Sequence, residues 1–197
     1  MGRGFLDRSG EGDGDRDEKI LANQLQPALA LPTSSTHKPS SLVDSVCKEA
    51  NELGHLNYND CVAALVFDPK ASFAKNKKLL AKIELNLAIS NSTSSLTYID
   101  AMAKKEKSSP ALKSALEYCV SQYQCTVQCF KMALTDLDVD PEAANYDAFV
   151  ANDGQYYCGE QLNSRGSQSQ VVDSINTRNY YVMLYSRIGQ IITNKMT

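Results

Sequence analysis

The sequence predicts an all-α fold, an up-down-up-down four-helix bundle that follows an N-terminal helical hairpin and carries two disulfides. Apolar residues recur at steps of three and four from residue 41 onward, which is the spacing of one face of an α-helix. Three dipeptides, Asp68-Pro69, Ser109-Pro110 and Asp140-Pro141, divide this part into long segments with short connections, and such connections favour antiparallel neighbours. Four of the six cysteines lie where one close pair and one distant pair could join these segments.

Length and composition divide the chain into two parts. The 197 residues suffice for one domain with a hydrophobic core. Residues 1–40 hold half of the glycines and half of the prolines with little periodicity, so we predict that they are disordered. Residues 41–197 are predicted to form a single helical domain.

Charge and residue types argue against several functions. The net charge is −3, and without an excess of basic residues we expect no nucleic-acid partner. The chain has two histidines, which removes most general-base, catalytic-triad and zinc-ligand schemes. A run of about 18 apolar residues, as a membrane helix needs, does not occur. We therefore expect a monomer that is not an enzyme, needs no cofactor or metal and has no membrane partner.

The predicted elements follow from the same signals. Residues 41–66 are expected to form the hairpin, and the four long helices are expected at 70–105, 110–137, 141–163 and 169–194. In each dipeptide named above, Asp or Ser can accept a hydrogen bond at the N-cap. Proline is tolerated at the first helical position because its missing N–H would be unpaired there. Residues 163–167 have the composition of a loop before the last helix.

The predicted helices differ in the faces that they would bury. The helix at 110–137 has an apolar seam with steps of three and four, made by Leu112, Leu116, Cys119, Tyr123, Val127, Phe130, Leu134 and Leu137. The helix at 141–163 has small residues along one side, which would let a neighbour approach closely: Ala144, Ala148, Ala151, Gly154 and Cys158. The helix at 70–105 contains a polar stretch, Ser90 to Ser95, which is a candidate position for a kink.

Four cysteines are candidates for disulfides. Cys47 and Cys61 bracket the hairpin, and a bridge between them would close about 15 residues and stabilise the fold by about 3 kcal/mol. Cys119 and Cys158 lie within two long helices, and a bridge between them would close about 40 residues and contribute about 4 kcal/mol. The alternative is that all four are buried free thiols.

Cys125 and Cys129 are predicted to be free thiols that face away from the apolar seam. Their i,i+4 spacing sets the Cβ atoms about 5–6 Å apart, too far for a relaxed disulfide within an intact helix. A metal site built on this pair would lack further cysteine or histidine ligands nearby in the sequence. The alternative is an intermolecular disulfide.

Several segments resemble the family of plant pectin methylesterase inhibitors and invertase inhibitors. The resemblance spans about residues 41–195 and lies in LVDSVCKEA, NYNDCVAALVFDP, LLAKIELNLAISN, PALKSALEYCVSQY and DVDPEAANYDAFVAND, with four cysteines in this order. The NYNDCV segment is most similar to the subgroup of invertase-inhibitor-like proteins that includes pollen allergens. The resemblance implies the bundle with its hairpin, and the disulfides Cys47–Cys61 and Cys119–Cys158.

The resemblance also implies a function and a location. Members of the family bind over the cleft of a carbohydrate-active enzyme, pectin methylesterase or invertase, so the implied partner is a target enzyme. The alternative is a non-inhibitory interaction or structural protein that keeps the fold. Members are secreted to the apoplast, the cell wall or the vacuole, whereas residues 1–19 contain ten charged residues and no apolar core of a signal peptide. We therefore expect secretion, and expect the secretory N-terminus to differ from this one.

The tripeptide that enters the target in invertase inhibitors, Pro-Lys-Phe, corresponds here to Pro141, Glu142 and Ala143. An anion thus replaces the cation and a methyl group replaces the aromatic ring, in a turn that also contains Asp136, Asp138, Asp140 and Asp147. A glycosidase cleft carries catalytic carboxylates, and like charges at an interface can cost several kcal/mol, so we do not expect inhibition of invertase by this route. Asp140 and Glu142 have an ordinary role at a helix N-terminus, which Asp136 and Asp138 lack.

Two further features are weaker candidates. Asn91-Ser92-Thr93 matches the N-glycosylation pattern, although an asparagine within a helix is a poor acceptor. Tyrosines at positions 156, 157, 180, 181 and 185 could form an aromatic docking surface, or could be core and boundary residues.

Overall fold

The computed structural model describes residues 39–54, 56–164, 169–194 and 196, which form helices only. Two short helices, α2 (Ser41–Glu52) and α3 (Tyr58–Val66), are followed by the 3₁₀ helix η2 (Pro69–Phe73). Four long helices complete the fold: α4 (Lys77–Lys105), α5 (Pro110–Asp136), α6 (Pro141–Asn163) and α7 (Gln170–Thr193). The expected disorder of residues 1–40 falls almost entirely outside the described residues.

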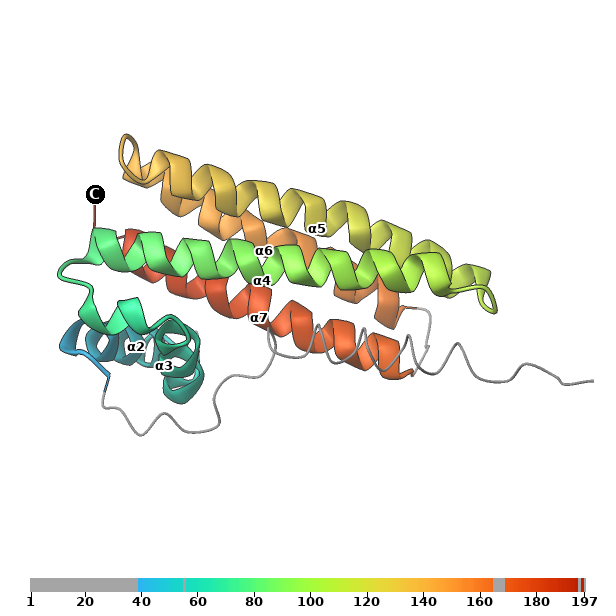
Figure 1. Cartoon of the computed structure of the whole chain (residues 1–197), viewed down its shortest axis with the longest axis horizontal. Helices are drawn as coiled ribbons and strands as arrows, with labels where there is room; N and C mark the ends of the chain where they lie inside the picture. Colours follow the sequence, from blue (N-terminus) through green and yellow to red (C-terminus); the bar gives the residue numbers. More distant parts are fainter. Residues whose placement is uncertain (1–38, 55, 165–168, 195, 197) are drawn as a thin grey trace, which may run out of the picture.

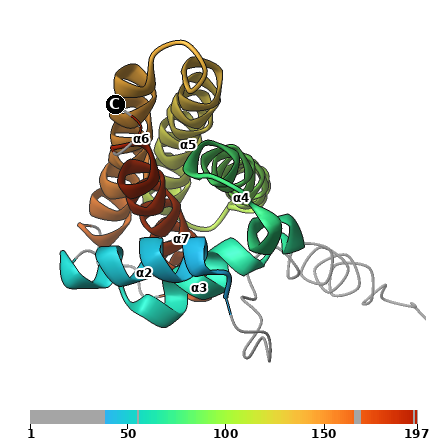
Figure 2. The same cartoon turned by 90° about the vertical axis from the view of Figure 1, so that its left-hand side faces the viewer.

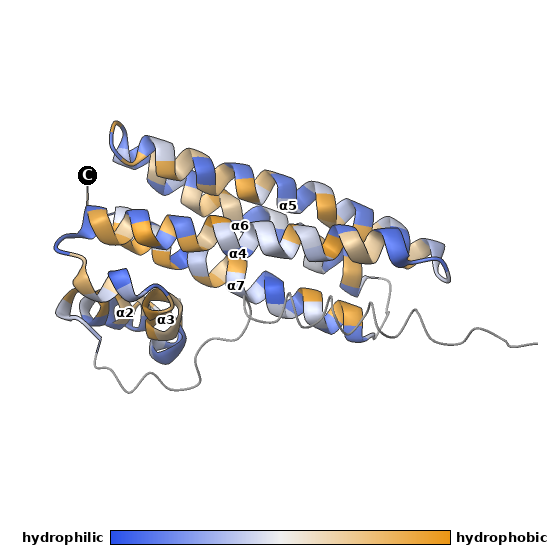
Figure 3. Ribbon diagram, in the orientation of Figure 1, coloured by the Kyte–Doolittle hydropathy of each residue, from blue (hydrophilic) through white to orange (hydrophobic). Residues whose placement is uncertain are grey.

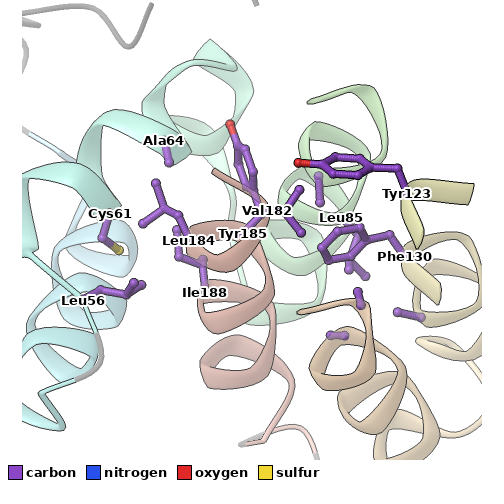
Figure 4. Close-up of a cluster of buried hydrophobic side chains, with 14 of the residues drawn as sticks. Leu56, Cys61, Ala64, Leu85, Tyr123, Phe130, Val182, Leu184, Tyr185 and Ile188 are labelled. Atoms are coloured by element: carbon purple, nitrogen blue, oxygen red, sulfur yellow. The ribbon is translucent and has the colours of Figure 1, made fainter. Parts of the chain in front are cut away.

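The long helices run up, down, up and down, as predicted, and each packs against the next, with α7 closing the bundle on α4 (Figure 1). The view along the bundle places α2 and α3 together beside one side of it (Figure 2). This hairpin packs on α7, where Leu56, Cys61 and Ala64 approach Leu184 and Ile188 (Figure 4). The all-α bundle with an N-terminal hairpin is therefore confirmed.

Side-chain caps set the helix starts. Ser109 and Asp140 accept hydrogen bonds from Leu112 N and Ala143 N at 3.2 and 3.1 Å, and proline follows each cap, as predicted. Asp68 also caps a helix, but it is the short η2. The predicted helix start at residue 70 was wrong, because the chain leaves η2 and α4 begins at Lys77, capped by Asn76.

The long helices bury one side and expose the other, so apolar and polar residues alternate along their ribbons (Figure 3). The seam of α5 is buried as predicted except at Leu134, which is half-buried. The small residues of α6 are also buried, and Gly154 meets α5 so closely that a β-carbon there would lie 2.2 Å from Thr126 Oγ1. This contact explains why the stripe on α6 contains glycine and alanine.

Two disulfides connect the elements that the sequence suggested. Cys47–Cys61 joins α2 to α3, and Cys119–Cys158 joins α5 to α6 across a sequence separation of 39 residues. Both thiols of the remaining pair, Cys125 and Cys129, are free.

The polar stretch of α4 does not interrupt the helix, which is continuous from Lys77 to Lys105 and drawn without a sharp bend (Figure 1). The candidate kink at Ser90 to Ser95 was therefore wrong. Ser92 and Ser95 are instead buried inside the bundle. Small hydroxyl side chains there let α4 pack closely without breaking its backbone hydrogen bonds.

Candidate functional site: the outer face of helix α6

Helix α6 buries its small residues and turns four aromatic side chains outward. Tyr146, Phe149, Tyr156 and Tyr157 are 65%, 45%, 55% and 49% exposed. Their spacing places them on one side of the helix, opposite the stripe of alanines and glycine. The exposed acids Glu142, Asp153 and Glu160 lie among them. We call these seven residues the α6 outer face.

The inner side of α6 is held by both of its neighbours. The Cys119–Cys158 disulfide ties it to α5, and the Thr126 hydroxyl donates a hydrogen bond of 3.0 Å to the Ala151 carbonyl. From α7, the Ser186 hydroxyl donates to the Ala148 carbonyl at 2.8 Å. These buried contacts fix the backbone that carries the outer face, so its aromatic side chains project from a rigid support.

The tripeptide singled out from the sequence forms the first turn of α6. Glu142 is exposed, whereas Pro141 and Ala143 are half-buried. Glu142 lies one helical turn before Tyr146, so the tripeptide adjoins the aromatic residues of the outer face. Just before it, Val139 is among the most exposed apolar side chains described, in the turn between α5 and α6. Tripeptide and turn thus form one end of a longer exposed surface.

The acidic turn is less unusual than its sequence suggested. Asp138 pairs with Lys78 and Lys82 of α4 at 2.8 and 2.6 Å, and these lysines lower the pKa of its carboxyl group. Asp140 is the N-cap of α6. Burial, and then the charge of Asp136, raises the pKa of Asp147. A structural role therefore exists for Asp138, which the sequence alone left without one.

From the sequence, five tyrosines could form an aromatic docking surface or be core and boundary residues, and the structure contains both kinds. Tyr156, Tyr157 and Tyr180 are exposed, Tyr181 is half-buried, and Tyr185 belongs to the core. Sequence reasoning missed Tyr146 and Phe149, although a signal was present. Both lie opposite the stripe of small residues, which the sequence had already identified as the buried side.

The remaining candidate residues do not join this surface. Cys125 is exposed on α5, and the thiol of the half-buried Cys129 has a raised pKa, first because of burial and then because of the charge of Asp147. Asn91 is buried within α4, so the folded chain does not present its amide to a glycosylating enzyme.

Metal-ligand clusters and membrane-spanning helices are both absent from the part of the chain that the structure describes. Groups of three or more His, Cys, Asp or Glu side chains that could hold a metal ion do not occur there. Among the described helices, none is both long and apolar enough to cross a membrane. What the α6 outer face offers is a contact surface for another molecule.

The comparisons with known proteins agree on one family. A family model described as plant invertase/pectin methylesterase inhibitor matches residues 41–194. The cell wall / vacuolar inhibitor of fructosidase 2 of Arabidopsis thaliana is 29% identical over 127 residues, which are 64% of this chain and 66% of that relative. The chain thus spans slightly less than two thirds of the length of this relative.

Two solved structures have a similar fold. A mutant form A of a pectin methylesterase inhibitor from Arabidopsis has a TM-score of 0.63 at 23% identity, covering 79% of this chain and 97% of that one. A pectin methylesterase inhibitor from Arabidopsis thaliana has a TM-score of 0.57 at 20% identity, covering 81% and 99%. At these identities the likeness concerns the fold.

Proposed function

Because the chain belongs to the plant invertase/pectin methylesterase inhibitor family, we propose that it inhibits a plant pectin methylesterase or invertase by covering the cleft of that enzyme. The contact surface is the α6 outer face together with Pro141, Ala143 and Val139 at its beginning. In this role the protein acts as a monomer, without a cofactor and without catalysis of its own.

The observation that carries this proposal is the row of exposed aromatic side chains on one helix. Tyrosine is enriched among the residues that contribute most to binding at protein interfaces. Each ring provides a large contact area and has few rotatable bonds, so little conformational entropy is lost when it is buried. Four such rings on one helix are more than a solvated face requires.

The rigid packing of α6 against its neighbours, beneath the exposed rings, favours binding as well. The disulfide between Cys119 and Cys158 and the hydrogen bonds to Ala148 and Ala151 hold α6 before any partner arrives. A surface that is already ordered avoids part of the entropy cost of association. Steric inhibition needs no chemistry beyond such a surface.

The charge of the surface bears on the choice of target. Glu142, Asp153 and Glu160 are exposed there, and we infer that they face a rim with basic groups, because like charges at an interface weaken association. The clash with glycosidase carboxylates remains an argument against insertion of Glu142 into an invertase active site. The experiment therefore compares both enzymes.

The two disulfides support an oxidising location, so we propose secretion to the apoplast, the cell wall or the vacuole.

The test is titration of the oxidised protein against a purified pectin methylesterase and a purified acid invertase. We expect stoichiometric inhibition of one of them. The double variant Tyr146→Ala, Phe149→Ala should weaken inhibition by about 100-fold, because each ring is expected to contribute on the order of 1–2 kcal/mol. Loss of exposed side chains should leave the free energy of unfolding nearly unchanged.

Tyr118→Ala is the matched control, since Tyr118 is 40% exposed on α5 and outside the proposed surface. It should inhibit as the wild type does. If the wild-type protein inhibits neither enzyme, the inhibitor proposal is wrong, and the alternative of a non-inhibitory interaction protein that keeps the fold takes its place.

A further inference from the structure

A groove of about 280 Å³ lies between the second half of α6 and the first half of α7. Four carboxamide side chains line it, those of Gln155, Asn163, Asn176 and Asn179. Its volume is near the lower end of the range for small-molecule sites, so it would suit one or two small rings rather than a long ligand.

Asn179 is the unusual member of this group. Its side chain is 5% exposed, yet only one of the two polar atoms of its amide makes a hydrogen bond within the described residues. Its Oδ1 accepts a hydrogen bond of 2.8 Å from the hydroxyl of Tyr123, which is itself fully buried in the bundle. That bond fixes which way the amide points. Nδ2, with two hydrogens to donate, makes no hydrogen bond to any residue that the structure describes.

Gly159 leaves this nitrogen uncovered. A β-carbon at position 159 would lie 3.4 Å from Asn179 Nδ2, so a longer side chain there would lie over the amide. Asn179 and Gly159 both line the groove. The amide of a buried residue, held in one orientation, thus faces the groove with its Nδ2, where a ligand could supply an acceptor.

We propose that this groove binds a neutral saccharide unit. A sugar hydroxyl both donates and accepts hydrogen bonds, which matches carboxamides that offer both groups side by side. The rings of Tyr156 and Tyr180 also line the groove and give it apolar surface against which the C–H groups of a sugar can pack. The hydroxyl of Tyr180 donates a hydrogen bond to Asp60 of α3, which holds that ring in place.

The charges around the groove favour a neutral sugar over an acidic one. Glu160 contributes a carboxylate to the lining. The groove also lies at the C-terminal end of α6, where the helix dipole is negative and disfavours anions. A uronate carboxylate would therefore be repelled, whereas hydroxyl groups could donate to Glu160.

The site can be tested on the free protein without any target enzyme, so its failure and the failure of the proposed inhibition are separate results. The measurement is a titration of ¹⁵N-labelled protein with sucrose and with sodium galacturonate, followed through the side-chain amide signals of Asn179. Sucrose should shift these signals with a millimolar dissociation constant. Galacturonate should bind at least about tenfold more weakly.

Gly159→Leu should fill the mouth of the groove and weaken sucrose binding by about tenfold or more, with the helix retained because leucine is a better helix former than glycine. Gln124→Leu, which adds the same side chain at an exposed position of α5 outside the groove, is the matched control and should bind as the wild type does. Tyr156→Ala removes an exposed ring from the lining and should also weaken binding.

Absence of any shift of the Asn179 amide with sucrose would overturn the proposal. Sucrose binding that is unchanged in both Gly159→Leu and Tyr156→Ala would also overturn it, since the sugar would then lie elsewhere. Equal affinity for galacturonate would contradict the neutral class of ligand.

Discussion

Helices α5 and α6 are joined by a disulfide and by close contacts of small side chains. Helices α4 and α7 instead each bury an ionisable side chain in their shared interface. Between α5 and α6, Gly154 lets the helices approach, and the Thr126 hydroxyl finds an acceptor at Ala151. Between α4 and α7, the carboxylate of Glu84 is fully buried beside Gly189 without a hydrogen-bond partner among the described residues. Arg178 is buried over the ring of Tyr98 at 4.1 Å, and its Nε and Nη1 find no hydrogen-bond partner in the described part of the chain.

The two interfaces of the bundle therefore differ in how much they contribute to stability. Buried polar groups that have partners strengthen a core, and those without partners weaken it. The α5–α6 pair therefore provides the rigid side that carries the α6 outer face. The α4–α7 pair closes the bundle but gives up part of the stability that an apolar interface of the same size would contribute.

The largest expected effect is loss of the α5–α6 disulfide. Replacing both Cys119 and Cys158 by alanine should lower the free energy of unfolding by about 4 kcal/mol, because the unfolded chain regains the entropy of a long loop. The matched variant without Cys47 and Cys61 opens a loop of 14 residues and should lose about 3 kcal/mol. Urea unfolding of both variants shows which one loses more free energy of unfolding. A larger loss for the variant without Cys47 and Cys61 would contradict the view that α5 and α6 form the more strongly stabilised pair.

A smaller effect is expected from a single methyl group at Gly154. A β-carbon there would lie 2.2 Å from Thr126 Oγ1 and 2.5 Å from the Gln122 carbonyl oxygen, so Gly154→Ala should destabilise by about 2–3 kcal/mol. Gly159→Ala is the control in the same helix. Its β-carbon makes only an ordinary contact, and helix propensity should raise stability by up to about 1 kcal/mol. Equal effects of the two changes in thermal or urea unfolding would show that the close approach of α5 and α6 is absent.

The smallest effect concerns Glu84 and depends on pH. Burial raises the pKa of this carboxyl group well above its usual value of 4.5. The protonated form is favoured in the folded state, so its contribution to stability is complete below pH 4.5 and is lost as the pH rises through the raised pKa.

Glu84→Gln should therefore match the wild type near pH 4 and exceed its stability by at least about 1 kcal/mol at pH 8. Urea unfolding midpoints between these pH values check this. An advantage of the variant that is the same at every pH would contradict the account, and so would a loss that grows with pH.

Much of the fold could be predicted because its signals are local. The caps before Pro110 and Pro141, the seam of α5 and the small residues of α6 each follow from a few neighbouring residues. The start of α4 could not be placed, because Asp68-Pro69 is an equally good start for a helix that ends after five residues. The burial of Glu84 and Arg178 could not be read from the sequence, since only the packing of α4 against α7 decides it.

The candidate site was predictable only in part. The tripeptide at the start of α6 was suggested by the family resemblance and stays a prediction, whereas the row of exposed aromatic residues up to Tyr157 can be found once the buried side of α6 is known. Asn179 and Gly159 lie on different helices, and their contact depends on how α6 and α7 pack. A single sequence carries no direct signal of such a pairing.

The most direct test of the central claim is hydroxyl-radical footprinting of the protein alone and in complex with the pectin methylesterase or invertase that we propose it inhibits. We expect Tyr146, Phe149 and Tyr157 to lose reactivity in the complex, because the α6 outer face is then covered. Tyr118 and Met132, which are similarly exposed on α5, should react as they do in the free protein. Protection of the α5 residues with unchanged labelling of α6 would contradict the account.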